Sequence, residues 1–276
     1  MTELTGRTAF ITGGANGIGL GIARALADRG VKIALADIDR DALDKAHAEL
    51  ESATEVHSVQ LDVRDRDAFA EAARSVEGAL GPVSILVNNA GVAGGAPADR
   101  LTYELWDWGM GINLGGVFNG IHTFLPGMIE RGEGGHVVNT SSIAGLYADT
   151  SGVLYHCAKF GVVGMTEALA VEMEGSDIGV TLLCPGAVAT GIVERTRALQ
   201  PRVTASMSAE QKRRAFEQFE TNKQVLASGA LPDQVGADVV EAICENRLYV
   251  LTSRVGAEQI GARSEAIIAA MPAQEP

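Results

Sequence analysis

Short apolar runs alternate with longer segments of helical periodicity along most of this chain. The runs are Thr8–Thr12, Val31–Ala36, Val56–Val63, Ser84–Val87, His136–Asn139 and Val180–Leu183. Most of these runs are largely apolar, which indicates strands buried on both faces, as in a parallel sheet with helices on either side. Right-handed crossovers then predict an α/β fold with a single doubly wound parallel sheet.

Helical segments separate these runs. They are predicted at residues 17–29, 41–51, 65–80, 103–131 and 155–174. Further helices are expected at residues 231–245 and at the C-terminus, with a possible last strand at 248–251 between them. The chain has 276 residues and shows neither an internal linker nor a repeat, so we expect one domain over residues 1–276.

The first run leads into a glycine-rich turn, Thr12-Gly-Gly-Ala-Asn-Gly-Ile-Gly19. Without side chains, such a turn lets the backbone approach a pyrophosphate, and the helix that follows offers free N–H donors and a partial positive charge. The spacing differs from the commonest dinucleotide fingerprint, G-x-G-x-x-G. A purely structural turn is the alternative, but the position between the first strand and the first helix favours a dinucleotide site.

Two aspartates follow the next two strands. Asp37 comes 18 residues after Gly19, where a carboxylate accepts hydrogen bonds from an adenosine ribose. A carboxylate there repels a 2′-phosphate, and the glycine turn contains no Lys or Arg to bind one, so NAD is favoured over NADP. Asp62 ends the third run and could reach the adenine amino group, with a simple strand-end cap as the alternative.

Tyr155 and Lys159 lie four residues apart on a predicted helix and so share one face. A phenol with a pKa of about 10 is a poor base at neutral pH. An ammonium about 4 Å away contributes about 4 kcal/mol in an effective dielectric of 20, roughly three pKa units, which would make the phenolate accessible. A packed tyrosine beside a surface lysine is the alternative when the pair is considered alone.

Several motifs together resemble the short-chain dehydrogenase/reductase family over about residues 5–191. They are Thr12–Gly19, Asp62, Asn88-Asn-Ala-Gly91, Asn113, Ser142, Tyr155-His-Cys-Ala-Lys159, and Pro185-Gly186 with Thr190. The resemblance implies an NAD(P)-dependent oxidoreductase on a Rossmann-type sheet.

The resemblance also implies catalytic roles. Tyr155 would be the general acid/base, and Ser142 would donate a hydrogen bond to the substrate oxygen, with Ser141 as the rival candidate. Lys159 would bind the nicotinamide ribose and lower the pKa of Tyr155. Asn113 would hold a water that connects Lys159 to solvent, and a structural bond in a helix is the alternative for this residue.

The cofactor and substrate residues follow by position. The expected NAD-binding residues are Gly13, Asn16, Gly17, Ile18, Gly19, Asp37, Ile38, Asp62, Val63, Asn89, Ala90, Gly91, Tyr155, Lys159, Pro185, Gly186, Val188 and Thr190. The expected substrate pocket contains Gly94, Ala144, Leu146, Tyr147, Gly186 and Ile192. These pocket residues are mostly small or apolar, which favours a hydrophobic substrate.

The segment 191–230 has a different composition. Between Glu194 and Lys223 it carries seven basic and four acidic residues, in a chain whose net charge is −13. We predict a helical lid whose apolar residues, Phe216, Phe219, Val225 and Leu226, close over substrate together with Ile192. The basic residues, Arg195, Arg197, Arg202, Lys212, Arg213, Arg214 and Lys223, are expected to stay solvated outside. A rigid helical pair that serves only for packing or subunit contact is the alternative.

Composition excludes other classes of function. A net charge of −13 disfavours nucleic-acid binding. Cys157, Cys184 and Cys244 form neither a disulfide framework nor a metal motif, and Cys157 is expected to be buried and inert. The N-terminus lacks a signal-peptide pattern and no run is long enough for a membrane span, so no membrane association and a cytoplasmic location are expected.

The leading functional hypothesis is an NAD-dependent dehydrogenase of a secondary alcohol, reversible with the matching ketone. A catalytically silent NAD-sensing or scaffold protein and an NADPH-dependent carbonyl reductase are the alternatives. A homo-oligomer, either dimer or tetramer, is expected. The tetramer is in doubt because the C-terminal strand ending in Asp-Gly-Gly, common in the family, is absent.

Overall fold

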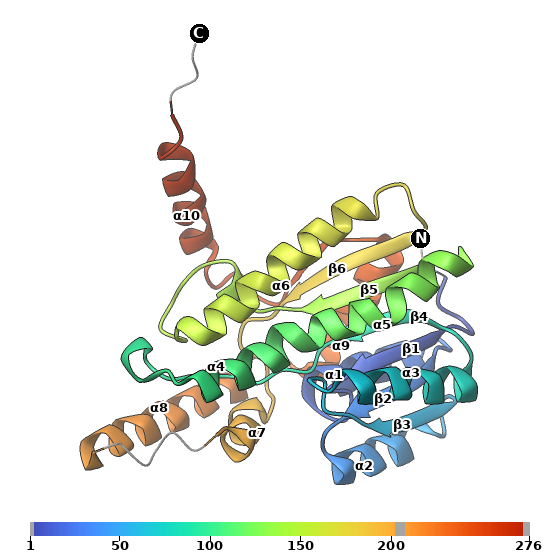
Figure 1. The fold of residues 1–276 in the computed structure, drawn as a ribbon, viewed down its shortest axis with the longest axis horizontal. Helices are drawn as coiled ribbons and strands as arrows, with labels where there is room; N and C mark the ends of the chain where they lie inside the picture. Colours follow the sequence, from blue (N-terminus) through green and yellow to red (C-terminus); the bar gives the residue numbers. More distant parts are fainter. Residues whose placement is uncertain (1–2, 202–207, 273–276) are drawn as a thin grey trace.

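A seven-stranded, all-parallel sheet forms the centre of the molecule, in the order β3-β2-β1-β4-β5-β6-β7 (Figure 1). The computed structural model describes residues 3–201 and 208–272. The strands are β1 Thr8–Thr12, β2 Lys32–Asp37, β3 Val56–Gln60, β4 Val83–Asn88, β5 Gly135–Thr140, β6 Ile178–Cys184 and β7 Tyr249–Leu251. The predicted doubly wound α/β fold is confirmed.

Helices connect successive strands and cover both faces of the sheet. They are α1 Gly17–Ala27, α2 Arg40–Leu50, α3 Arg66–Leu80, α4 Tyr103–Met110, α5 Gly116–Arg131, α6 Val153–Glu172, α7 Ile192–Leu199, α8 Ala209–Ala227, α9 Pro232–Glu245 and α10 Ala257–Ala269. Among these described residues, no helix is both long and apolar enough to cross a membrane.

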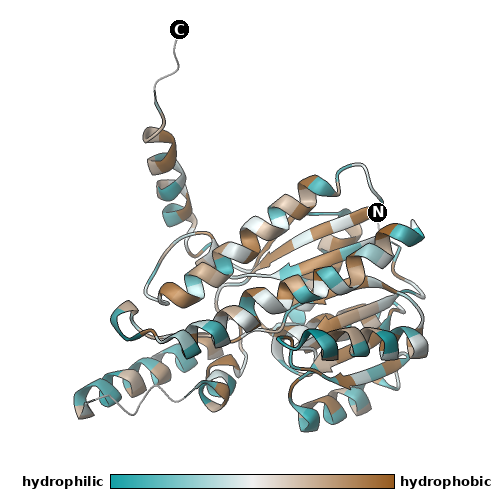
Figure 2. Cartoon of the chain, in the orientation of Figure 1, coloured by the Kyte–Doolittle hydropathy of each residue, from teal (hydrophilic) through white to brown (hydrophobic). Residues whose placement is uncertain are grey.

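The core lies in two layers, one on each side of the sheet. Ile11 belongs to the cluster under α1, α2 and α9, whereas its neighbour Phe10 belongs to the cluster under α3 and α5. Phe10, Phe69 and Phe124 meet there, with ring centroids 4.7 to 6.4 Å apart. Consecutive strand side chains point to opposite faces, so continuously apolar strands supply both layers at once. Figure 2 shows this apolar sheet between helices with polar outer faces.

Two boundaries differ from the sequence prediction. β3 ends at Gln60 rather than at Val63, because Asp62 accepts a hydrogen bond from the backbone N–H of Arg64 and turns the chain out of the sheet. The expected long helix over 103–131 contains a π-helical turn at Gly111–Gly115 between α4 and α5. π-helical turns are rare in proteins, but those that do occur are often found at functional sites.

Two helices extend from the body of the protein. None of the residues of α8 or α10 is buried. α10 extends away from the sheet, and α8 lies beside α7 beyond the carboxyl ends of the strands (Figure 1). Residues 202–207, including Arg202, belong to the predicted insertion but lie outside the described residues.

Candidate active site

The glycine turn between β1 and α1 leaves an open cradle at the N-terminus of α1. Asn16 is the N-cap residue, but its side chain makes no capping hydrogen bond. A Cβ at Gly19 would lie 2.2 Å from the carbonyl oxygen of Gly13, and Gly17 has a φ of +51°, so neither position readily accepts a side chain. An anion can therefore come close to the backbone of the turn and to the N-terminus of α1. The turn fits the diphosphate of a dinucleotide.

Asn89 holds this turn in place from the end of β4. Its side-chain N–H₂ donates to the carbonyl oxygens of Thr12 (3.1 Å) and Gly13 (3.3 Å). The hydroxyl of Thr12 accepts from the backbone N–H groups of Asn89 (2.9 Å) and Ala90 (3.1 Å). The predicted segment Asn89–Gly91 therefore lies against the glycine turn.

Asp37 lies at the end of β2, beside the same turn. Its carboxylate accepts hydrogen bonds from the backbone N–H groups of Ala15 (3.3 Å) and Asp39 (3.1 Å). Burial raises the pKa of Asp37, while those two bonds and the charge of Arg195 oppose the rise. Ile38, the next predicted cofactor residue, is 42% exposed and offers an apolar surface there.

Asp62 is engaged within the protein. The guanidinium of Arg64 donates to both of its carboxylate oxygens, with distances from 2.6 to 3.1 Å. These bonds hold the pKa of Asp62 below its usual range. The side chain thus makes a local turn and an ion pair, as in the strand-end alternative, and Val63 beside it is buried.

Ser142, Tyr155 and Lys159 converge at the carboxyl ends of β5 and β6. The hydroxyl of Ser142 lowers the pKa of the nearby Tyr155 phenol, and the Lys159 ammonium lies 5.8 Å from the centroid of the Tyr155 ring. The ammonium donates to the carbonyl oxygen of Thr140 at 3.1 Å. Ser141, the rival serine, is buried and donates instead to the carbonyl oxygen of Lys159 at 2.8 Å.

The protonation pattern differs from the expectation for Tyr155. Burial raises the pKa of Tyr155, the nearby hydroxyl of Ser142 lowers it, and the charge of Asp149 raises it further. Lys159 is not among the groups that shift this pKa; its ammonium lies over the ring and is bonded to the carbonyl oxygen of Thr140. Burial also lowers the pKa of Lys159, to about 8.

Asn113 lies in the π-helical turn and is buried. Its amide accepts from the backbone N–H of Val92 (2.9 Å) and donates to the carbonyl oxygen of the same residue (3.0 Å). This is the structural bond given as the alternative role for Asn113. A Cβ on Gly91 would lie 3.0 Å from Asn113 Oδ1 and 3.6 Å from Lys159 Nζ, so these three residues are neighbours.

The loop after β6 crosses the same edge of the sheet. The carbonyl oxygen of Pro185 accepts from the backbone N–H of Ile143 at 3.0 Å, and the N–H of Gly186 donates to Thr252 Oγ1 at 3.0 Å. Val188 is buried and bridges to Ala230, and the Thr190 side chain reaches the glycine turn next to Gly17. This loop therefore links the two ends of the predicted cofactor site.

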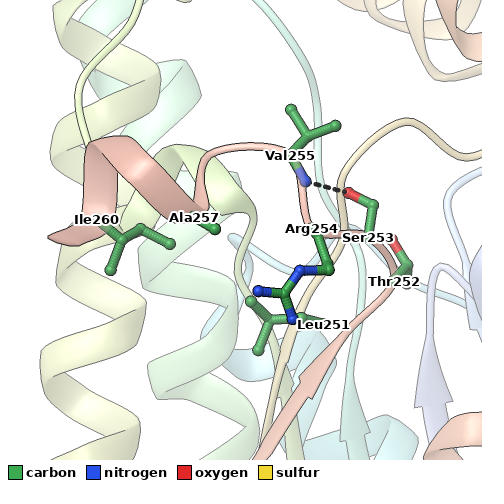
Figure 3. A pocket seen from close by; sticks show the side chains of 7 residues that line it. All are labelled: Leu251, Thr252, Ser253, Arg254, Val255, Ala257 and Ile260. Atoms are coloured by element: carbon green, nitrogen blue, oxygen red, sulfur yellow. Dashed lines mark hydrogen bonds between the residues drawn. The ribbon is translucent and has the colours of Figure 1, made fainter.

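The predicted substrate residues are only partly accessible. Ala144 and Tyr147 are buried, and the ring of Tyr147 packs against Gly256. Leu146 and Ile192 are partly exposed, and Gly94, with a φ of +78°, has open space around it. A hollow of about 390 Å³ lies next to Gly186, at the base of α10 (Figure 3). Its lining residues are Leu251, Thr252, Ser253, Arg254, Val255, Ala257 and Ile260.

The helices of the insertion match only half of the predicted division into an apolar inner face and a solvated basic outer face. Arg197 and the basic residues of α8 are exposed, as predicted. Phe216 and Val225 of the predicted inner face, however, are each 53% exposed as well. The guanidinium of Arg197 lies 4.7 Å from the ring centroid of Phe219 and 5.9 Å from that of Phe216, so α7 and α8 contact each other through a cation and aromatic rings.

Cys157 is exposed, contrary to the expectation of a buried thiol. It lies between Tyr155 and Lys159 on α6, whose side chains face the site. Two residues along a helix correspond to a rotation of about 200°, so Cys157 points to the opposite side.

Comparisons with known proteins agree with this geometry. The family model described as short chain dehydrogenase matches residues 7–201. The chain belongs to the short-chain dehydrogenase/reductase family. It is 34% identical over 253 residues to a C alpha-dehydrogenase of Sphingobium sp. (strain NBRC 103272 / SYK-6), covering 91% of this chain and 82% of that one.

Solved structures of short-chain dehydrogenases extend the match to the C-terminal helices. One from Burkholderia phymatum in complex with NAD has a TM-score of 0.91 at 33% identity, covering 100% of this chain and 99% of that one. A putative short-chain dehydrogenase from Novosphingobium aromaticivorans has a TM-score of 0.82 at 40% identity, covering 100% and 90%.

Several side chains at the site are not predicted from the sequence. Thr196 is buried on α7, and its hydroxyl accepts from the backbone N–H of Ala93 at 2.8 Å. His156 Nδ1 donates to the carbonyl oxygen of Ala144 (2.7 Å), and its Nε2 lies 3.0 Å from an Asp149 carboxylate oxygen. The sequence carries no signal for these contacts except that His156 adjoins Tyr155.

Proposed function

We propose that this protein is an NAD-dependent dehydrogenase that oxidises a secondary alcohol to a ketone and catalyses the reverse reduction. The convergence of Ser142, Tyr155 and Lys159 beside the glycine turn carries the proposal. It combines a proton-transferring phenol, a hydroxyl donor and an ammonium at one edge of the sheet.

Proton transfer is assigned to Tyr155. In alcohol oxidation, its phenolate oxygen takes the proton of the substrate hydroxyl, and in ketone reduction its hydroxyl returns one. The hydroxyl of Ser142 orients the substrate oxygen between them. Bound NAD supplies hydride exchange with the carbinol carbon. Lys159, mostly protonated below its pKa of about 8, is proposed to bind the nicotinamide ribose through its ammonium.

Asp37 supports the choice of NAD. Its carboxylate is held by two backbone N–H groups at the end of β2, beside the glycine turn. A fixed negative charge there can accept bonds from ribose hydroxyls and repels a 2′-phosphate. The Burkholderia phymatum structure, similar over the whole chain, is a complex with NAD.

The substrate is proposed to be a hydrophobic small molecule. The similarity to a C alpha-dehydrogenase supports the dehydrogenase direction. We further propose a cytoplasmic homo-oligomer, with one domain over residues 1–276 and a lid formed by residues 191–230. The exposed Ile267, Ile268 and Met271 at the end of the chain support an oligomer.

The two alternatives are less well supported. A silent NAD-sensing or scaffold protein has no need for hydroxyl, phenol and ammonium groups to converge, and an NADPH-dependent reductase has no use for a carboxylate at the position of Asp37.

A panel of secondary alcohols with NAD⁺ tests the proposal, with formation of the reduced cofactor followed by absorbance. We expect turnover with apolar or aromatic alcohols and none with the Tyr155→Phe variant. Binding of NAD without turnover of any alcohol or ketone in the panel would favour the silent protein. Higher efficiency with NADP than with NAD would favour the reductase.

A further inference from the structure

Arg195, on the first turn of α7, lies against the glycine turn. A Cβ on Gly17 would be 3.6 Å from one terminal nitrogen of its guanidinium, and a Cβ on Gly191 would be 3.1 Å from the other. Its charge also lowers the pKa of Asp37 across the site. The sequence prediction of a solvated outer arginine is therefore wrong for this residue, and a cation does approach the turn, from a distant part of the chain.

The Arg195 guanidinium is attracted by the Asp37 carboxylate but repelled by the end of α1. Gly17 is the first residue of α1, and the N-terminus of a helix carries a partial positive charge that repels a guanidinium. Three other basic residues of the insertion have acidic partners, namely Arg213 with Glu217, Arg214 with Glu210, and Lys223 with Glu194. A negative ligand between Arg195 and the helix end turns this repulsion into attraction on both sides.

α7 is connected to both the site and the outer helix. Thr196, next to Arg195, binds the backbone of Ala93 at the site. Arg197 lies over Phe219 of α8, and Lys223 of α8 pairs with Glu194 at 3.2 Å. A change in the position of the Arg195 side chain can thus alter the position of α7 and, through these contacts, that of α8.

We propose that Arg195 binds the diphosphate of the dinucleotide and thereby fixes the α7–α8 segment when the cofactor binds. The proposal rests on the proposed function, since it deepens the role of the same site. Cofactor binding then adds a contact to α7 besides the bond between Thr196 and Ala93, and so organises the substrate side.

Ligand fragments separate the diphosphate from the rest of the dinucleotide. Binding of ADP-ribose and of adenosine is measured by calorimetry for the wild type, Arg195→Ala, Arg195→Lys and Arg214→Ala. Arg214→Ala removes the same charge from the same insertion, at a side chain that pairs within α8. We expect Arg195→Ala to weaken ADP-ribose binding by about 10- to 100-fold, as for loss of a charge-assisted hydrogen bond.

Adenosine binding should not change in any variant, Arg195→Lys should recover part of the loss, and Arg214→Ala should behave as the wild type. ADP-ribose should also protect the amides of residues 209–227 from hydrogen exchange in the wild type but not in Arg195→Ala. Equal affinity of the wild type and Arg195→Ala for ADP-ribose, or equal losses for both fragments, would overturn the role of Arg195. Failure of the wild type to bind ADP-ribose would instead overturn the dinucleotide site itself.

Discussion

The ammonium of Lys159 lies 5.8 Å from the centroid of the Tyr155 ring, one helical turn along the same face of α6. The geometry is that of a cation over an aromatic face, and the nitrogen is bonded to the carbonyl oxygen of Thr140. The hydroxyl of Ser142 lowers the pKa of the same phenol. Lys159 and Ser142 thus both act on Tyr155, and each side chain can be removed separately.

Tyr155→Phe keeps the ring and removes the proton carrier. We expect turnover to fall by about 10²- to 10⁴-fold or more, the usual loss of a general acid/base, with little change in NADH affinity. Tyr103→Phe is the matched control, since Tyr103 is 91% exposed. Lys159→Ala should lose both turnover and affinity. Near-normal turnover of Tyr155→Phe in steady-state assays would contradict the role of Tyr155 as the general acid/base.

The pH dependence of alcohol oxidation should respond in opposite directions to two substitutions. Oxidation needs the phenolate, so its rate rises as pH approaches the pKa of Tyr155. The charge of Asp149 raises that pKa, so Asp149→Asn should move the rising limb to lower pH. Ser142 lowers it, so Ser142→Ala should move the limb to higher pH, besides slowing turnover. Profiles of kcat/KM against pH test this, and shifts in the same direction would contradict it.

Asp37 should decide the choice of cofactor. We expect kcat/KM to favour NAD over NADP by orders of magnitude, because like-charge juxtaposition costs several kcal/mol. Asp37→Ala should reduce this preference, mainly by improving NADP. Asp41→Ala, which removes the same charge from the exposed first turn of α2, should leave the preference largely intact. If both variants reduced the preference for NAD equally, the overall negative charge of this region would be responsible rather than Asp37 itself.

The insertion is predicted to act as a lid. Amides at 192–201 and 208–228 should exchange rapidly in the free protein and gain protection when NAD and substrate are both bound. Closure of such segments commonly takes microseconds to milliseconds and can limit turnover. Protection that is already high and does not change with ligands would support the alternative of fixed packing. Mass-spectrometric hydrogen exchange separates the two.

His136 should make stability depend on pH. It is fully buried on β5, and burial lowers its pKa from 6.5 to about 3. The unfolded chain therefore binds a proton that the folded protein excludes, so stability falls as pH drops from about 6.5 toward 3. Between pH 7 and pH 5 this one group accounts for about 2 kcal/mol.

Urea unfolding of the wild type and of His136→Gln at both pH values checks this. Glutamine does not titrate and can still reach Thr181, the partner of His136 Nε2 at 2.8 Å. The variant should lose less stability on acidification than the wild type, even if it is less stable at pH 7. An equal loss in both proteins would assign the acid sensitivity to other groups.

The sequence by itself determined the order of strands and helices and the position of the glycine turn. These are local properties, since buried strands require continuous apolar runs and a turn that approaches its ligand requires glycines at fixed positions. It also indicated Tyr155 and Lys159 as one face of a helix, because helical periodicity alone brings residues four apart together. The family spacing pointed to Ser142 over Ser141, and in the structure Ser141 is engaged with the carbonyl oxygen of Lys159 while Ser142 lowers the pKa of Tyr155.

Only the tertiary structure decided which side chains remain free to act at the site. Asp62 is engaged by Arg64, and the amide of Asn113 is engaged by Val92, contacts that no residue pattern signals. Arg195 reaches the glycine turn although it lies in a charged segment that resembles a solvated helix. Contacts of this kind join residues far apart in the chain, as Thr196 and Ala93 are, 103 positions apart. Local periodicity cannot encode them, because they depend on how the loops at the carboxyl edge of the sheet pack against one another.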